Sequence, residues 1–425
     1  MSGALLCLGL AGTLANAFAP TFPLWPGTAA TWLAGVILFF FLGAAQRRIV
    51  VILSSLSIAA WAYVWYRGYS GDISRAFSIN QALVALLIGV NFLQLVAAPQ
   101  KRADEPLPMG TKAFIRTYTG VLFFSSVINL SAVMLVGDRL SKQIALNENQ
   151  QKLLTRAFSS AANWSPFFAA FGAASVFTPG ANFSIIICCG LLISAIAFLF
   201  TLGELKAGGG QALRNFSGYP MHFGVLWLPI ILSLLVLLAQ MLFPSVKIIL
   251  LIALFSVLTS LIVLATRQGT HTATYTVQRH ILNRLPEMRG ELLLFLVAGL
   301  FGTGLATLIT GMGIDFPIAT FDGFVACGIL LFMVTMSLVG VHPVIGIAVI
   351  GPWLAPLQPD QTLLAMTFLM AWALSVSLSP VSGLALALQG RYKLSPVVML
   401  RMNLPYAIKV YATCCILLLL IDAIA

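Results

Sequence analysis

Long apolar runs separated by short polar stretches dominate the pattern along this chain. A helix needs about 20 apolar residues to cross a bilayer, and the clearest runs are Phe183–Gly203, Phe223–Leu242, Ile248–Ala265 and Leu292–Thr310. In all, the pattern predicts eleven spans, at about 4–19, 28–45, 49–65, 80–98, 115–137, 181–203, 222–243, 247–266, 291–312, 322–351 and 397–423. These spans predict an all-α polytopic membrane protein.

Two further apolar segments, about 148–176 and 354–390, are too short or too broken for ordinary spans. Each carries a Ser-Pro dipeptide near its middle, Ser165-Pro166 or Ser379-Pro380. Proline removes a backbone donor and ends the helix before it. Because non-helical backbone at membrane depth must line a cavity or be buried in protein, we predict two re-entrant hairpins with Ser-Pro at each tip.

One arrangement around these dipeptides occurs twice. In each copy a glycine precedes the Ser-Pro by 28 residues, and another hydroxyl-Pro dipeptide follows it. The first copy comprises Gly137, Ser165-Pro166 and Thr178-Pro179, and the second comprises Gly351, Ser379-Pro380 and Ser395-Pro396. A repeated pair of interrupted hydrophobic segments points to the binding site of a transporter.

The repeat divides the chain into four parts. We predict scaffold helices at 1–114, a first repeat core at 115–205 with hairpin 148–176, further scaffold helices with a basic cytoplasmic loop at 206–328, and a second core at 329–425 with hairpin 354–390. A cytoplasmic N-terminus puts fourteen Lys and Arg in inner loops and seven in outer loops, Arg156 among the latter. This excess predicts an external C-terminus and hairpins that open to opposite sides, which is an inverted repeat.

Composition supports the membrane assignment, because 60% of the residues are hydrophobic and only 8% are charged. A soluble fold could not bury that much apolar surface. The net charge of +11 fits loops that face the cytoplasm and anionic lipid better than it fits a nucleic-acid partner. No Cys or His lies at metal-ligand spacing, so we expect no metal centre and no cofactor, with Na⁺ as a possible coupling ion.

The predicted spans have no carboxylate at mid-membrane, which argues against a carboxylate proton relay. The deepest ionisable residue is His342, which Pro343 follows. An intramembrane histidine can contact substrate or couple protons near neutral pH. Alternatively, His342 donates to a backbone carbonyl that the proline leaves free.

The two tips are rich in hydroxyl and amide oxygens, which are hard ligands suited to sodium. Helix N-termini after each proline would present N–H groups to an anion. The candidate binding residues are Asn129, Asn163, Ser165, Pro166, Thr178, His342, Ser377, Ser379, Pro380, Ser382 and Ser395. The alternative is that these small residues only allow helices to pack closely.

The whole pattern resembles the ion transporter superfamily, which includes the divalent anion:sodium symporters. The resemblance covers about 115–205 and 329–423, and Asn163-Trp164-Ser165 and Ser377-Leu378-Ser379 stand where that family carries Ser-Asn-Thr tips. It implies eleven spans, two oppositely oriented hairpins, and tips that bind sodium and a substrate carboxylate. It also implies a transport domain that moves against a scaffold, in a homodimer.

We therefore expect a secondary active transporter of the cytoplasmic membrane for a small organic anion, coupled to Na⁺ or H⁺. Its partners would be that solute and membrane lipid. One alternative is an exporter or flippase for a lipid-linked or amphipathic solute. A second is a membrane-embedded transferase, an enzyme class that needs a catalytic acid or histidine at an interface. The sequence contains no His-x4-Asp motif and no acidic cluster.

Overall fold

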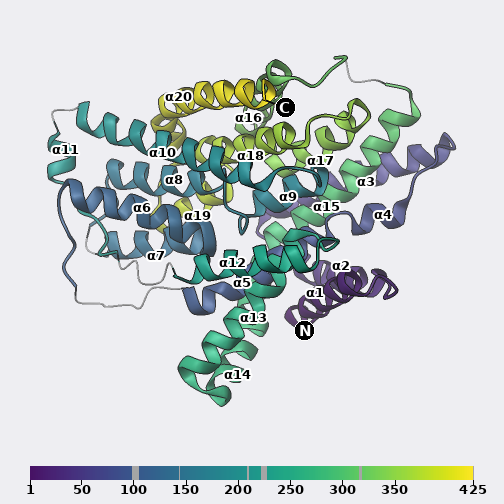
Figure 1. The fold of residues 1–425 in the computed structure, drawn as a ribbon, viewed down its shortest axis with the longest axis horizontal. Coiled ribbons are helices and arrows are strands. Elements are labelled where there is room, and N and C mark those ends of the chain that lie inside the picture. Colours follow the sequence, from purple (N-terminus) through teal and green to yellow (C-terminus); the bar gives the residue numbers. More distant parts are fainter. Residues whose placement is uncertain (98–104, 143, 208–209, 222–226, 315–317, 425) are drawn as a thin grey trace. The chain divides into compact units, whose positions relative to one another are not determined.

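The computed structural model describes residues 1–97, 105–142, 144–207, 210–221, 227–314 and 318–424 (Figure 1). Among these residues, seven helical segments are long and apolar enough to cross a membrane. They are Ala44–Tyr66, Ile73–Val96, Phe183–Ala207, Ile248–Gln268, Thr270–Gly311, Gln361–Tyr392 and Pro396–Asp422. Five shorter helical segments are also apolar. The prediction of an all-α polytopic membrane protein is confirmed.

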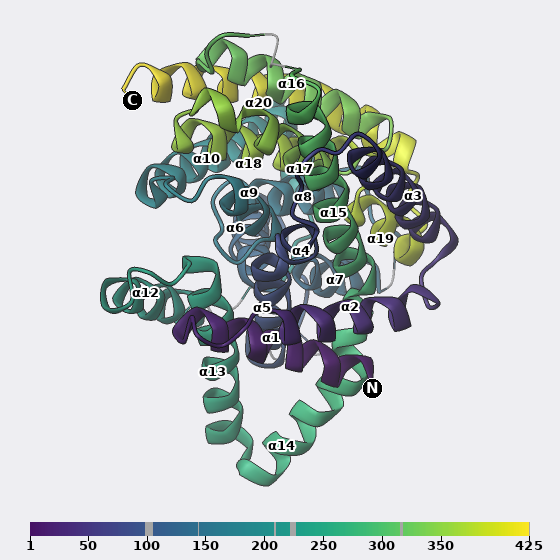
Figure 2. The ribbon, with the colours of Figure 1, turned by 90° about the vertical axis from the view of Figure 1, so that its right-hand side faces the viewer.

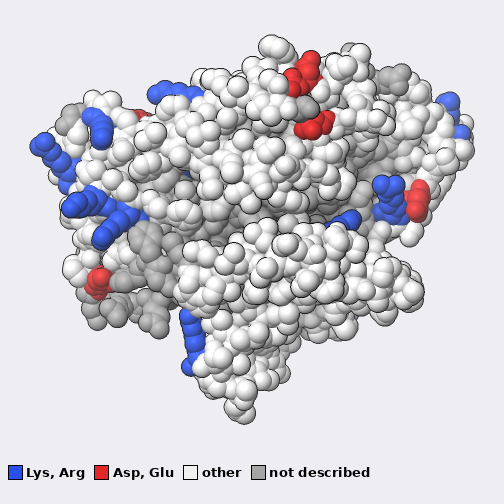
Figure 3. Space-filling view, viewed as in Figure 1, with Lys and Arg blue, Asp and Glu red and all other residues white. Residues whose placement is uncertain are grey.

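The surface is suited to lipid. On the face that Figure 3 draws, charged side chains are sparse and uncharged residues cover most of the area. Large apolar side chains such as Ile58, Leu238 and Ile262 are exposed by 59–69%. Exposed apolar area on this scale marks contact with a membrane or a partner.

The chain forms two compact units. Unit 1 comprises Met1–Val96, Pro229–Ala319 and Val344–Gln358, and unit 2 comprises Ala97–Leu228, Thr320–Pro343 and Pro359–Ala425. These boundaries differ in four places from the parts drawn on the sequence. Residues 97–114, 206–228 and 320–328 are grouped with unit 2, and residues 344–358 are grouped with unit 1.

Unit 1 is built on close helix pairs, and α1 (Ser2–Phe18) packs along α2 (Trp25–Phe39) while α3 (Ala44–Tyr66) packs along α15 (Arg289–Gly311). Buried Gln81 donates to the hydroxyls of Thr13 and Thr31, each at 2.9 Å, and so joins three helices. The other helices are α4 (Ile73–Ser78), α5 (Gln81–Ala97), α12 (Trp227–Leu242), α13 (Ile248–Gln268), α14 (Thr270–Arg279), the π-helical turn η2 (His280–Arg284), and the 3₁₀ turns η3 (Leu285–Met288) and η4 (Ala355–Leu357), with α17 (Pro343–Leu354).

Unit 2 has two broken helices at its centre. The first is α8 (Glu148–Ala161) with α9 (Ala169–Phe177), and the second is α18 (Gln361–Leu378) with α19 (Gly383–Tyr392). Around them lie α6 (Thr111–Ile128), α7 (Leu130–Leu140), α10 (Phe183–Ala207), α11 (Gln211–Arg214), α16 (Gly323–Leu338) and α20 (Pro396–Asp422). Helix α8 packs against α6 and α10, and α18 packs against α16 and α20.

Both Ser-Pro dipeptides lie in the turn between the two halves of a broken helix, Ser165-Pro166 after α8 and Ser379-Pro380 after α18. The sequence therefore located both breaks. Gln361–Tyr392 also qualifies as a span by length and composition. A re-entrant course of either segment within a membrane stays a prediction.

Two predicted spans are not continuous helices. The span 115–137 is divided between α6 and α7 at Asn129, which has φ 49°. The span 322–351 is divided between α16 and α17 by residues that include Gly340, with φ 99°. The prediction of single helices was wrong there, because a residue with positive φ ends a right-handed helix. Most other spans match single helices to within a few residues, and 222–226 lie outside the described residues.

Asn129 should tolerate glycine but not a branched side chain. Its dihedrals (φ 49°, ψ −134°) are in a region that glycine occupies freely and that costs other residues about 1–3 kcal/mol. We expect Asn129→Gly to preserve or raise the thermal stability of the detergent-purified protein, and Asn129→Val to lower it. Asn149→Val, at a helical position in α8, is the matched control. An equal loss at both positions would contradict the assignment of strain to Asn129.

Candidate functional site

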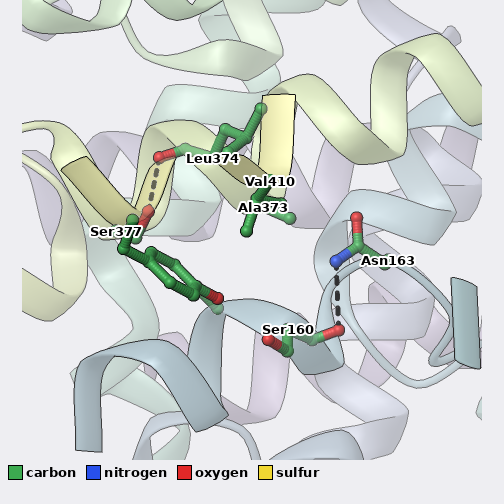
Figure 4. Close-up of a pocket in the computed structure, with 8 residues that line it drawn as sticks. Ser160, Asn163, Ala373, Leu374, Ser377 and Val410 are labelled. Carbon is green, nitrogen blue, oxygen red and sulfur yellow. Dashed lines mark hydrogen bonds between the residues drawn. The ribbon is translucent and has the colours of Figure 1, made fainter. Parts of the chain in front are cut away.

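A small buried cavity lies in unit 2, where the ends of α8 and α18 meet α20 (Figure 4). Its volume is about 10 Å³, which is room for about one water-sized particle. The lining residues are Ser159, Ser160, Asn163, Ala373, Leu374, Ser377, Tyr406 and Val410. They come from both broken helices, which are more than 200 residues apart in the sequence. Two predicted site residues, Asn163 and Ser377, are among them.

The polar groups of this cavity are mainly hydrogen-bond acceptors. Ser159 and Ser160 donate their hydroxyl protons to the Arg156 carbonyl at 3.1 and 2.7 Å, and Ser377 donates to the Leu374 carbonyl at 2.8 Å. Each hydroxyl oxygen therefore keeps lone pairs for another partner.

Asn163 adds a further acceptor. Its amide nitrogen donates to the Ser160 carbonyl at 3.3 Å (Figure 4), and the amide oxygen is buried without a partner among the described residues. A buried polar atom without a partner is costly, so an unpaired one in a cavity suggests a missing ligand. Oxygen acceptors without carboxylates can hold a small hard cation or a hydrogen-bond donor such as water.

The two Ser-Pro serines make equivalent hydrogen bonds. Ser165 donates to the carbonyl of Ser126 at 2.5 Å, and Ser379 donates to the carbonyl of Ser337 at 2.7 Å. Each acceptor lies in the last turn of a helix and three residues before the positive-φ residue that follows it, Asn129 or Gly340. The repeat in the sequence therefore corresponds to a repeated contact in unit 2.

Beside the cavity lies a fully buried arginine, Arg156 of α8, with 0% exposure. Its guanidinium donates to Glu204 at 2.6 Å, to the Asn403 side-chain oxygen at 3.1 Å and to the Met402 carbonyl at 3.1 Å. It also lies over the Tyr406 ring at 4.4 Å from the centroid. Because each of its three side-chain nitrogens donates a hydrogen bond and its face lies on Tyr406, Arg156 is a positioning residue for the cavity wall rather than a free anion receptor.

The count that placed Arg156 in an outer loop was wrong, because the residue lies inside α8 and is completely buried. One sequence signal could have identified it. Lys152, Arg156, Ser160 and Asn163 recur at intervals of three or four residues, which puts them on one face of a helix. Lys152 reaches the same carboxylate, at 2.9 Å from Glu204.

Asn403 of α20 joins the two broken helices and was not among the predicted site residues. It is 0% exposed, accepts from Arg156, and donates to the Ser377 carbonyl at 3.1 Å and the Thr155 hydroxyl at 3.4 Å. These contacts fix α8, α18 and α20 around the cavity. Gly190 of α10 has a related role, because a Cβ there would lie 2.3 Å from the Asn163 carbonyl oxygen.

The other predicted site residues lie outside the cavity lining. Ser382 caps α19 by accepting from the Ala385 N–H, Thr178 donates to the Ala174 carbonyl at the end of α9, and exposed Ser395 precedes α20. Half-buried Pro166 and Pro380 follow the two serines in the turns, and Asn129 lies at the break between α6 and α7. The His342 ring packs edge-on against Trp372, with centroids 5.1 Å apart.

The glycine of the first repeat copy has a packing role. A Cβ at Gly137 would lie 2.5 Å from the Tyr392 hydroxyl oxygen. That hydroxyl donates to the Met134 carbonyl at 3.0 Å, and the neighbouring Arg391 pairs with Asp138 at 2.5 Å. Gly137 therefore lets the end of α19 lie directly on α7.

Comparisons with known proteins leave the family open. No protein-family model matches the chain, and its sequence matches no curated protein. A similar solved structure is the crystal structure of the Alcanivorax borkumensis YdaH transporter, which is described as having an unusual topology. It is 15% identical, with 87% of this chain and 84% of that one covered and a TM-score of 0.45. The resemblance to the ion transporter superfamily stays a prediction, and function must be argued from the site.

Glu204→Gln should destabilise the protein strongly, because it leaves Arg156 buried without a carboxylate. Breaking a buried ion pair on one side costs about 3–5 kcal/mol, and the partial exposure of Glu204 (36%) puts this case at the lower end. The additional change Arg156→Met should recover part of the loss, since no buried charge then remains. Thermal unfolding of the single and double variants measures this coupling.

The exposed residue Arg214 supplies the control for these variants, because Arg214→Met removes a cation from the surface of unit 2. If Glu204→Gln were no more destabilising than Arg214→Met, the network would not stabilise unit 2.

Proposed function

We propose that this protein is an ion-coupled secondary active transporter that moves a small organic anion across the cytoplasmic membrane. The acceptor-lined cavity between the ends of α8 and α18 supports this proposal most directly. If this region served only helix packing, the buried amide oxygen of Asn163 would cost free energy without a benefit, because it has no partner among the described residues. The membrane concerned, the orientation of the termini and a homodimer remain predictions from the sequence.

The coupling ion that fits this cavity best is Na⁺. Five side-chain oxygens belong to residues that line it, those of Ser159, Ser160, Asn163, Ser377 and Tyr406. Those of the three serines have already donated their protons to backbone carbonyls. Oxygen ligands suit hard cations. The cavity of about 10 Å³ admits one small ion but no organic solute.

The neighbouring charges would keep binding of this ion reversible. Arg156 would repel a cation in the cavity, whereas Glu204 neutralises most of that repulsion through its 2.6 Å ion pair. A coupling ion must leave as readily as it binds, and moderate affinity serves that need.

The anion would bind at the turns that follow the two Ser-Pro dipeptides. Helices α9 and α19 begin just after these turns, and helix N-termini carry partial positive charge. Two compact units would suit an elevator mechanism, in which the unit that holds the site moves against the other.

Removing single cavity oxygens should weaken the dependence of transport on sodium. We expect Asn163→Ala, Ser160→Ala and Ser377→Ala each to raise the sodium concentration for half-maximal uptake about tenfold, since a lost ligand costs roughly 1–3 kcal/mol. The assay is uptake into proteoliposomes with sodium and pH gradients imposed separately. Ser175→Ala is the control, because Ser175 donates to Phe171 within α9 and does not line the cavity.

Wild-type sodium dependence in all three cavity variants would show that the cavity is a packing defect. The alternative of an exporter or flippase for an amphipathic solute would then be the better hypothesis.

A variant of His342 can distinguish sodium coupling from proton coupling. The residue lies at the break between α16 and α17, against Trp372 and outside the cavity lining. If sodium is the coupling ion, His342→Gln should leave the pH dependence of uptake unchanged and reduce only the thermal stability. A shift of the pH profile, with sodium dependence retained, would instead assign proton coupling to His342.

A further inference from the structure

A second and much larger hollow lies within unit 1. It is a groove of about 620 Å³ between α13 and α14, closed at one end by η2 and the start of α1. Figure 2 shows α13 and α14 as the two arms of a V, and Gly269, with φ 77°, forms the turn between them. Its volume falls in the range of about 300–1,000 Å³ that is usual for ligand sites.

The walls of the groove are mostly apolar. They include Leu261 and Ala265 on α13, Ala273 and Val277 on α14, Ile281 on η2 and Ala4 on α1. Helix α14 is amphipathic, because its groove residues recur every three or four positions while exposed His271 and Tyr275 lie on another face.

Exposed apolar side chains lie on the α13 wall of the groove. Leu261 on α13 is 37% exposed and its neighbour Ile262 is 62% exposed, and α13 is one of the candidate membrane spans. At the base of the groove α1 is held tightly, since a Cβ at Gly3 would lie 1.8 Å from the Ile281 carbonyl oxygen. A chain that enters from the lipid side therefore meets preformed walls.

Positive charge accompanies the groove. Arg279 directly follows Gln278, a groove residue, and Arg284 and Arg289 lie further along the same segment. The only acidic residue among 267–289 is Glu287, which pairs with Arg284 at 3.2 Å. Within the described part of the chain, Arg279 and Arg289 have no ion-pair partner. The segment thus has surplus positive charge beside an apolar groove.

We propose that the groove binds one anionic phospholipid. An acyl chain would lie between α13 and α14, and the phosphate would meet Arg279, which directly follows the groove residue Gln278, at the membrane interface. Free phosphate would gain nothing from the apolar walls. A zwitterionic lipid would fill the groove but would not neutralise the surplus arginine charge.

Native mass spectrometry of the full-length, delipidated protein tests this proposal. We expect dioleoyl phosphatidylglycerol to be retained more strongly than dioleoyl phosphatidylcholine. Thr274→Trp, which fills the groove, should abolish retention of both lipids. Thr272→Trp, two residues away on the other side of α14, is the matched control and should bind as wild type does. Ala265→Phe, from the α13 wall, provides a second filling variant if Thr274→Trp does not fold.

The charge contribution is measured separately. Arg279→Gln should weaken phosphatidylglycerol retention about fivefold, the value for one basic residue at a membrane surface, and leave phosphatidylcholine retention unchanged. Arg75→Gln, on α4 of the same unit, is the control. Equal retention of the two lipids, full retention in a folded groove-filling variant, or displacement of phosphatidylglycerol by inorganic phosphate would overturn the proposal.

Discussion

A helix that ends in the interior of a protein leaves backbone carbonyls without helical partners, and a buried carbonyl without a partner is costly. Unit 2 meets this constraint in the same way twice. The hydroxyls of Ser165 and Ser379 donate to carbonyls in the last turns of α6 and α16. Each serine stands directly before a proline, so it belongs to one helix break while it satisfies another. In each copy of the repeat, one serine side chain therefore links two helix breaks, the break after α6 to that after α8, and the break after α16 to that after α18.

The buried positive charge of Arg156 is stabilised by helices of unit 2. Burial of a guanidinium is expensive unless every donor finds a partner, and Arg156 has partners on α10 and α20 as well as the Tyr406 ring. In turn its backbone carbonyl accepts from Ser159 and Ser160. The charge network and the cavity are thus built on one turn of α8, and disruption of either would move the other.

The sequence predicted the helices and the Ser-Pro breaks because both rest on local signals, apolar length and the missing N–H of proline. It missed the break at Asn129, since even asparagine adopts positive φ at only a minority of its positions and the surroundings decide which. It missed the roles of Arg156 and Asn403 for a different reason. Their partners Glu204 and Ser377 are 48 and 26 residues away, and pairing at such distances is decided by packing that periodicity does not encode.

The predicted site residues fall into two groups, those that line the cavity and those that lie outside it. Ser165 and Ser379 donate their protons to backbone carbonyls, and neither lines the cavity. The cavity-lining positions are two residues earlier, at Asn163 and Ser377. A residue directly before a helix break is needed to satisfy the break itself. Two residues earlier, Ser377 still lies within α18, whereas Asn163 lies in the turn that follows α8.

The size of the cavity then limits where an anion could bind in the proposed mechanism. A volume of about 10 Å³ holds an ion but excludes any organic solute, so the two ligands cannot share this space. The Ser-Pro turns offer the nearest alternative, because Pro166 and Pro380 are only half-buried and Val381 is 41% exposed. An ion in the cavity would brace Asn163 and Ser377, which lie just before these turns. Ion binding would thereby order the anion's binding surface without contact between the two ligands, and this would couple them thermodynamically.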